Sequence, residues 1–144
     1  MFIKKSVLVG LVLFIVLFCI LGLLVLSGEL LLAVVRGRSM IPLLRQGDIV
    51  FIVKAKPEEI KIGEVIVFRG RGGELIIHRV VDIVSMNNTY YYVTKGDNNP
   101  GPDVWHFGNK PGIPFDRVVG KVVGINDFVL KIPYIGEITL MFKW

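Results

Sequence analysis

The sequence predicts a mainly β protein, in which a small, partly closed antiparallel β-barrel is tethered by one N-terminal transmembrane helix. Two observations predict this fold. An uncharged apolar run of about twenty residues lies near the N-terminus, and short segments rich in Val, Ile and Tyr follow it, each bounded by turn residues. Short strands of this kind, without a long amphipathic helical pattern between them, are typical of antiparallel barrels.

The apolar run extends from Ser6 to Leu26 and follows two lysines, Lys4 and Lys5. At 1.5 Å per residue a helix of this length spans roughly 30 Å, the hydrocarbon thickness of a bilayer. A cleavable signal peptide has a shorter apolar core of about 7–15 residues, followed by a small-x-small cleavage site. We therefore expect an uncleaved anchor, with a removed signal ending near Ser27-Gly28 as the alternative.

Charge and composition limit the classes of partner. The two N-terminal lysines favour a cytoplasmic N-terminus, although arginines soon after the run weaken this argument. The net charge of +5 could suit nucleic acid or anionic lipid, but the basic residues are scattered singly, which argues against nucleic acid. The single cysteine, Cys19, lies inside the apolar run, so the sequence predicts neither a disulfide nor a cysteine metal site.

Beyond the anchor we expect strands joined by tight turns. Hairpin turns are predicted at Arg69–Gly73 and Asn87-Asn88, and no helix is expected beyond a turn at Lys56–Ile60. Gly96–Pro114 is a long loop, of a length that usually serves function. The predicted strands are Leu30–Val35, Ile49–Val53, Val65–Phe68, Leu75–Val84, Tyr90–Lys95 and Val118–Ile125.

This pattern divides the chain into three segments. Residues 1–28 form the anchor, residues 29–127 form the β domain, and residues 128–144 form an apolar C-terminal segment interrupted by Lys131, Pro133 and Glu137. The last segment is too short and too broken for a second span, so it is either membrane-interfacial or a strand that closes the barrel.

A lone serine, Ser39, stands beside an unusually apolar loop closed by Pro42. Proline keeps Ile41 out of helical geometry, so we expect the segment that holds Ser39 to be extended. Exposed apolar clusters mark binding or membrane contact. The residues expected to contact substrate or membrane are Met40, Ile41, Leu43 and Leu44.

The chain contains two histidines, His78 and His106. His78 shares its strand face with Ile76 and Val80, and apolar surroundings favour the neutral imidazole. A general base needs this neutral state, but a histidine with only a structural role in the core has it too. The pattern alone favours the structural role. His106 is expected to be a surface residue.

A catalytic imidazole needs a carboxylate to hold its tautomer. Asp82 lies four residues from His78 along the strand, roughly 13 Å away, and cannot reach it. The long loop offers Asp97 and Asp103, which the residues alone leave equal. Calcium is rejected because the acidic ligands are few and the spacing is wrong, and zinc because ligands are lacking. We therefore expect no metal and no cofactor.

Four ordered boxes carry a resemblance to a known family. They are Gly37–Pro42, Gln46–Val50, Ile77–Val81, and Lys95–Asn99 continuing to Asp103, and Pro133–Gly136 adds to them. The chain resembles type I signal peptidases (serine peptidase family S26), specifically the archaeal and endoplasmic-reticulum branch, in which histidine replaces the bacterial lysine base. The resemblance covers Val34 to Gly136. It implies a functional role for His78, in place of the structural role that the pattern alone favours.

The resemblance implies roles for particular residues. Ser39 would be the nucleophile, His78 the general base and Asp103 the aspartate that completes the relay, with Asp97 in support. This chain departs from the family's pattern at Ile41, where glutamate is common, and in the Pro-Gly-Pro before Asp103. Neither departure affects a group that transfers a proton.

The implied function is a membrane-bound serine endopeptidase that removes signal peptides from secreted precursors after small residues. Its partners would be signal-peptide-bearing preproteins, the lipid bilayer and, as an open alternative, the protein-translocation channel. It would lie in the cell membrane, or in the endoplasmic-reticulum membrane of a eukaryote, with a cytoplasmic N-terminus and the catalytic domain on the outer or lumenal face. The rival functions are a peptidase dedicated to one or a few substrates and a non-catalytic, membrane-anchored β binding module.

Overall fold

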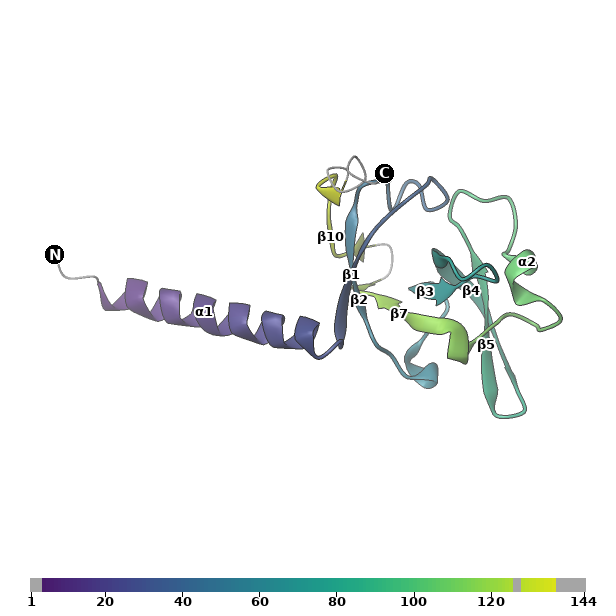
Figure 1. Cartoon of the computed structure of the whole chain (residues 1–144), viewed down its shortest axis with the longest axis horizontal. Coiled ribbons are helices and arrows are strands. Elements are labelled where there is room, and N and C mark those ends of the chain that lie inside the picture. Colours follow the sequence, from purple (N-terminus) through teal and green to yellow (C-terminus); the bar gives the residue numbers. More distant parts are fainter. Residues whose placement is uncertain (1–3, 126–127, 137–144) are drawn as a thin grey trace. The chain divides into compact units, whose positions relative to one another are not determined.

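The computed structural model describes residues 4–125 and 128–136 (Figure 1). The chain divides into two compact units, Met1–Leu31 and Leu32–Trp144. The first unit contains helix α1, Lys5–Leu26, and the second contains the β domain.

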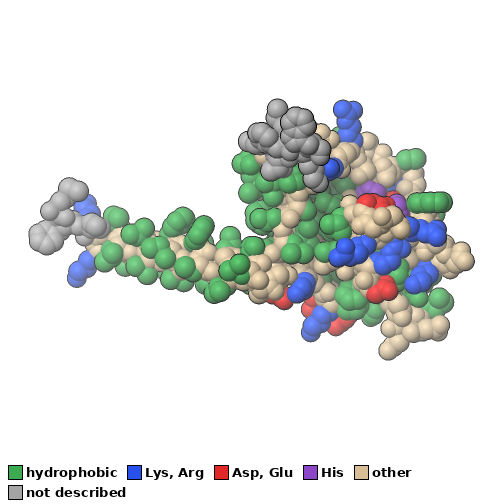
Figure 2. Space-filling view, viewed as in Figure 1, with side chains coloured by type: hydrophobic (Ala, Val, Ile, Leu, Met, Phe, Trp, Pro, Cys, Tyr) green, Lys and Arg blue, Asp and Glu red, His purple; other side chains and the backbone are tan. Residues whose placement is uncertain are grey.

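Helix α1 is 22 residues long and is long and apolar enough to cross a membrane. None of its residues is buried in the structure, and Figure 2 shows hydrophobic side chains along the whole visible face of the helix. A helix that is apolar all round cannot leave that surface in water, whereas a bilayer would cover it. The predicted membrane-length helix is therefore present, and it begins and ends close to the expected residues.

Over the described ranges, the β domain contains one eight-stranded sheet and one two-stranded sheet. The order in the larger sheet is β1-β2-β7-β3-β4-β5-β6, with β10 beside β2, and β8 pairs with β9 in the smaller sheet. The sheet does not close on itself, which confirms the predicted mainly β, partly closed domain. The strands are β1 Leu30–Val34, β2 Ile49–Val53, β3 Val65–Arg69, β4 Leu75–Met86, β5 Thr89–Lys95, β6 Ile113–Pro114, β7 Val118–Val122, β8 Gly124–Ile125, β9 Phe128–Val129 and β10 Lys131–Ile132.

Several local expectations differ from the structure. The segment expected as one strand from Val118 to Ile125 is split into β7 and β8, which belong to different sheets. The long loop contains a four-residue helix, α2 (Val104–Phe107), although no helix was expected there. One turn of helix is too short to produce a 3.6-residue pattern in the sequence. Two 3₁₀ turns complete the domain, η1 at Pro57–Glu59 and η2 at Phe115–Arg117.

The C-terminal segment contributes strands to the β domain as far as it is described. β10 pairs antiparallel with β2, and β9 pairs antiparallel with β8. Residues 137–144, which include Glu137, lie outside the described part of the chain.

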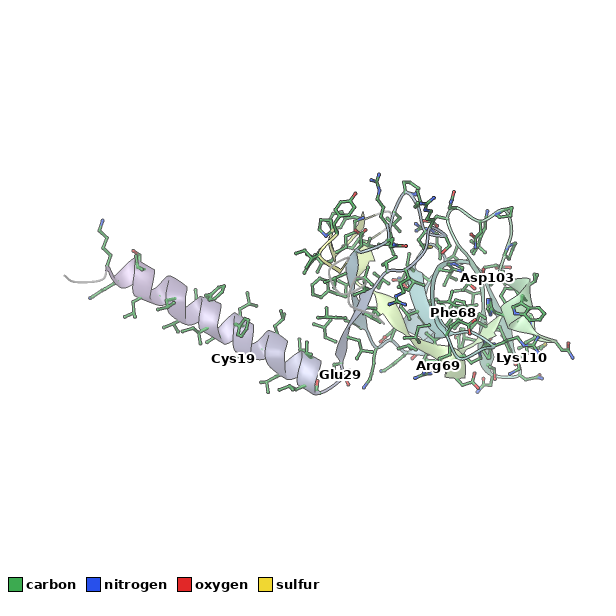
Figure 3. The ribbon with its side chains drawn as sticks, turned by 45° about the horizontal axis from the view of Figure 1, so that its top comes forward. Cys19, Glu29, Phe68, Arg69, Asp103 and Lys110 are labelled. Carbon is green, nitrogen blue, oxygen red and sulfur yellow. The ribbon has the colours of Figure 1, made fainter. Side chains whose placement is uncertain are left out.

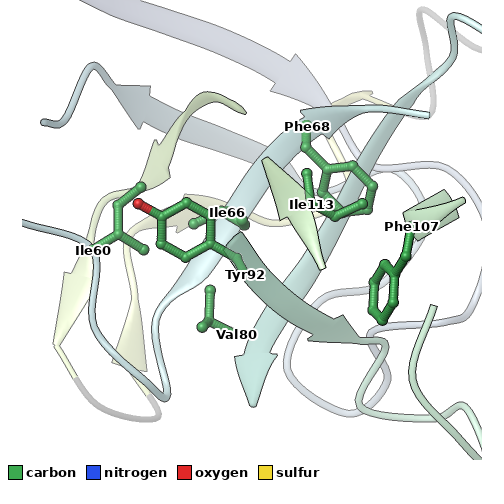
Figure 4. Packing of buried hydrophobic residues seen from close by; sticks show 7 residues of the cluster. All are labelled: Ile60, Ile66, Phe68, Val80, Tyr92, Phe107 and Ile113. Carbon is green, nitrogen blue, oxygen red and sulfur yellow. The ribbon is translucent and has the colours of Figure 1, made fainter. Parts of the chain in front are cut away.

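The core gathers side chains from β3, β4, β5 and β6 and from the loops that flank them (Figure 4). The Tyr92 hydroxyl donates a hydrogen bond to the Pro57 carbonyl at 2.9 Å, which satisfies the one polar atom of a fully buried ring. Burial, followed by the nearby Tyr90 and Glu58, raises the pKa of Tyr92 to about 12. The core residues are Ile60, Ile66, Phe68, Val80, Tyr92, Phe107 and Ile113.

A buried carboxylate, Asp48, joins the segment just before β2 to β10. It accepts hydrogen bonds from Lys131 Nζ at 2.7 Å and from the backbone N–H groups of Arg45 at 3.0 Å and Tyr134 at 3.4 Å. Burial alone would raise the pKa of Asp48, but the hydrogen bond from Lys131, those from the two backbone donors and the lysine charge outweigh it. Its pKa therefore lies below the usual 3.8.

We predict that Asp48→Asn lowers the free energy of unfolding by about 1.5–3 kcal/mol, because hydrogen bonds to a charged group are lost. Because the folded-state pKa is depressed, this contribution is present above about pH 4 and is lost as the pH falls through the folded-state value. Denaturant melts between pH 3 and pH 7 should therefore converge for the two proteins at acid pH. Asp116→Asn, at an exposed position, is the matched control. A constant difference at all pH values would contradict this account.

Candidate active site

Ser39 lies in a turn rather than in the extended segment that was expected. The turn covers residues 39–43, and the Leu44 N–H donates to the Met40 carbonyl at 2.8 Å. The restriction that Pro42 imposes applies to Ile41, its immediate neighbour, and does not extend back to Ser39. The serine therefore stands at the start of a tight turn between β1 and β2.

Three side chains from distant parts of the sequence meet at this turn. His78 Nε2 lies 3.0 Å from Ser39 Oγ, and His78 Nδ1 lies 2.6 Å from Asp103 Oδ2. An ionised carboxylate can only accept hydrogen bonds, so Nδ1 carries the proton and donates to it. Nε2 is then free to accept the serine O–H, which is the arrangement that makes a hydroxyl nucleophilic.

The surroundings of this row are largely dry. His78 and Asp103 are 7% and 9% exposed. The buried ring of Phe68 meets the His78 ring edge-on, with centroids 6.4 Å apart (Figure 3 labels Phe68 and Asp103). Low dielectric strengthens each hydrogen bond and makes an unpaired polar group costly, so the three side chains depend on one another.

The second loop aspartate occupies a different place. Asp97 forms a bidentate ion pair with Arg79. The Arg79 Nε lies 2.8 Å from Oδ1 of Asp97, and the Arg79 Nη2 lies 2.7 Å from Oδ2. A third donor of Arg79 bonds the Gly63 carbonyl at 2.7 Å. The structure therefore places Asp103, and not Asp97, on the His78 ring, while Asp97 anchors its own loop to β4.

That loop holds the serine by its backbone. The Asn98 N–H donates to the Ser39 carbonyl at 2.7 Å, and the Asn98 side chain donates to the Arg38 carbonyl at 3.2 Å. Gly96 allows this close approach, since a Cβ there would lie 2.8 Å from the Ser39 carbonyl oxygen. The Gly-Asp-Asn-Asn sequence therefore positions the serine backbone without joining the hydrogen-bonded row of Ser39, His78 and Asp103.

A groove of about 940 Å³ opens beside Ser39 and His78. One wall is formed by residues 32–37, which include most of β1, and the other by residues 74–78, at and just before the start of β4. Met40, Val67 and His106 also line the groove. Pro42, Leu43 and Asp97 help to line a separate hollow of about 700 Å³.

The four apolar residues expected to contact substrate or membrane divide into two pairs. Met40 and Leu44 are buried, at 2% and 0% exposure, because the turn folds their side chains into the domain. Lipid contact is therefore excluded for them in this conformation, although Met40 still lines the groove. Ile41 and Leu43 remain partly exposed.

His106 also differs from the surface position that was expected. It is half-buried, and its ring packs edge-to-face with Phe68, with the ring centroids 6.2 Å apart. Its Nδ1 lies 3.7 Å from a Glu74 carboxylate oxygen. It belongs to the groove wall. Among the described residues, no group of three or more His, Cys, Asp or Glu side chains could hold a metal ion.

Sequence reasoning missed one buried polar residue of the site, Thr94. Its hydroxyl donates to Asp103 Oδ2 at 2.8 Å. The sequence held a signal for it, because Thr94 lies two residues after Tyr92 and so shares the inward face of β5. A buried polar group on that face needs a hydrogen-bond partner.

Comparisons with known proteins find chains of similar sequence. Residues 19–98 match the model of the family described as Peptidase S24-like. The chain is 32% identical to the signal peptidase complex catalytic subunit SEC11C of Homo sapiens, over 85% of this chain and 62% of that protein. It is also 32% identical to sec11 of Dictyostelium discoideum, over 83% and 65%. These relatives confirm the resemblance that the four boxes predicted, and the chain spans less than two thirds of the length of either.

We predict that Gly96→Ala destabilises the domain by about 1–3 kcal/mol, because the new methyl group would press on the Ser39 carbonyl and the Asn99 side chain. Gly101→Ala in the same loop is the control, since nothing lies within 4 Å of a Cβ there. Chemical denaturation of both variants measures the difference. Equal stability of the two variants would show that the loop does not approach Ser39 this closely.

Proposed function

Because the chain belongs to the Peptidase S24-like family, we propose that it is a membrane-anchored serine endopeptidase that removes signal peptides from secreted precursors, cutting after small residues. The observation that carries this proposal is the hydrogen-bonded row of Ser39, His78 and Asp103 beside an open groove. The relatives are signal peptidase complex catalytic subunits, which supports the choice of substrate.

In the proposed mechanism Ser39 Oγ attacks the carbonyl carbon of the scissile bond while its proton passes to His78 Nε2. The imidazolium that forms is stabilised by the Asp103 carboxylate, which stays ionised. His78 then gives the proton to the leaving amine, and water releases the acyl group from Ser39 by the same route in reverse. A backbone N–H near Ser39 would stabilise the oxyanion.

The strand pairing supports an extended peptide as the substrate. β3 pairs with β4 from Leu75 to Arg79, whereas the β5 pairing begins only at Arg79. Over Leu75–His78, β4 therefore has no neighbouring strand on its β5 side among the described residues. An extended chain can add to such an edge with its backbone, and the groove runs along it. In this proposal the groove, which Val34, Met40 and Ile77 help to line, would receive the small side chains near the cut.

The anchor supports the choice of a membrane-borne substrate. A signal peptide is held in the bilayer by its own apolar core, so an enzyme tethered by α1 meets it at high effective concentration. In this proposal the N-terminus is cytoplasmic and the β domain lies on the outer or lumenal face. Preproteins, the bilayer and the translocation channel are then the partners.

We predict that Ser39→Ala and His78→Ala each lower the cleavage rate of a model preprotein by about four to six powers of ten, and that the double variant is no worse. Members of a triad act as a unit, so the second loss costs nothing further. Asp103→Asn should cost about four powers of ten. Purified full-length protein in phospholipid vesicles, assayed by gel and mass spectrometry, gives the measurement.

Ser85→Ala, at an exposed position of β4, is the control for this series and should cleave like the wild type. Retained cleavage by Ser39→Ala would overturn the serine-peptidase proposal. Loss of cleavage in the control would trace the effects to folding.

A further inference from the structure

The Asp103 carboxylate is held by more than the catalytic histidine. One of its oxygens, Oδ2, accepts the Nδ1–H of His78 at 2.6 Å and the hydroxyl of Thr94 at 2.8 Å. The two donors come from neighbouring strands, β4 and β5, which pair with Val80 opposite Thr94. The oxygen that faces the imidazole is thus fixed from two directions.

Thr94 also ties down the backbone of Asp103. The Asp103 N–H donates to the Thr94 carbonyl at 2.9 Å, so residues 94 and 103 are joined by one backbone bond and one side-chain bond. These two bonds close the base of the intervening loop, which carries Asp97 and Asn98. The carboxylate can neither rotate about its side chain nor shift with the loop without breaking one of them.

Thr94 itself is 0% exposed and is absent from the residues that line the groove. Thr94 therefore does not line the groove that would hold a peptide, and its hydroxyl is linked to the site through its hydrogen bond to Asp103. Without the Thr94 hydroxyl, the buried Oδ2 would keep only the His78 donor and would lose one of the two hydrogen bonds that fix its direction.

We propose that Thr94 is a positioning residue, whose hydroxyl holds Asp103 Oδ2 against His78 Nδ1 and so maintains the tautomer that leaves Nε2 open to Ser39. This inference rests on the proposed serine-peptidase function. The competing explanation is that Thr94 serves stability alone, as a buried hydroxyl that has found an acceptor.

The test compares Thr94→Val, which keeps the shape and removes the hydroxyl, with Thr94→Ser, which restores it. Thr94→Val should lower kcat by about 10- to 100-fold, because a hydrogen bond to a charged group is lost. KM should stay unchanged, because Thr94 does not line the groove. Thr94→Ser should recover most of kcat. Thr89→Val, at the far end of β5, is the matched control and should behave like the wild type.

A second arm shows whether the effect passes through Asp103. In an Asp103→Asn background, Thr94→Val should cause no further loss of kcat, since the group it positions is already gone. If Thr94→Val fails to fold, Thr94→Ala, which introduces no bulk, takes its place. A full kcat in the hydroxyl-free variant, no recovery with serine, or additive losses in the double variant would each overturn the proposal.

A third readout does not depend on activity. The His78 Nδ1 proton in its short bond to Asp103 should give a far-downfield proton NMR signal in the full-length protein in detergent. Thr94→Val should move or broaden this signal, and Thr94→Ser should restore it. If the wild type does not cleave while the signal still responds, the proposed function fails and the positioning role stands. An unaltered signal in Thr94→Val would sink the positioning role itself.

Discussion

The site depends on one buried carboxylate, Asp103, which must find its hydrogen-bond donors within the protein. At 9% exposure the charge of Asp103 cannot rely on water, so it must be met by donors from the protein. It finds one on β4, His78, and one on β5, Thr94. Meeting this need aligns the imidazole, and the aligned imidazole presents Nε2 to Ser39. The hydrogen bond between the imidazole and Ser39 thus depends on how the Asp103 carboxylate, two hydrogen bonds away from Ser39 Oγ, finds its donors.

The sheet supplies the scaffold for this row. β4 and β5 pair antiparallel, and the loop that leaves β5 turns back so that residue 103 lies beside residue 94. The Arg79–Asp97 ion pair and the Asn98 bond to the Ser39 carbonyl then link the same loop to the turn that carries the serine. One loop therefore positions both ends of the row. For this reason a methyl group added at Gly96 should displace the backbone of Ser39.

Much of this architecture could be predicted from the sequence. Alternating β-branched segments and turn residues located the strands, and a long uncharged run located α1. The roles of Asp97 and Asp103 could not be distinguished from the residues alone. The two differ because Asp97 forms an ion pair with Arg79 of β4, and this contact is visible only in the fold. The burial of Met40 and Leu44 was missed for a similar reason. An apolar loop suggests a binding surface, but the sequence does not show which of its side chains point into the domain. Thr94 escaped because its partner lies nine residues away, across a loop.

The central claim is that the hydrogen-bonded row makes Ser39 nucleophilic, and labelling tests it most directly. A fluorophosphonate probe, which bonds covalently to activated serines, can be added to the full-length protein in vesicles, and the modified residue located by mass spectrometry. The account predicts modification of Ser39 in the wild type and little or none in His78→Ala, with Ser85 unmodified in both. Modification of Ser85 but not Ser39 in the folded protein, or labelling of Ser39 that persists without His78, would contradict it.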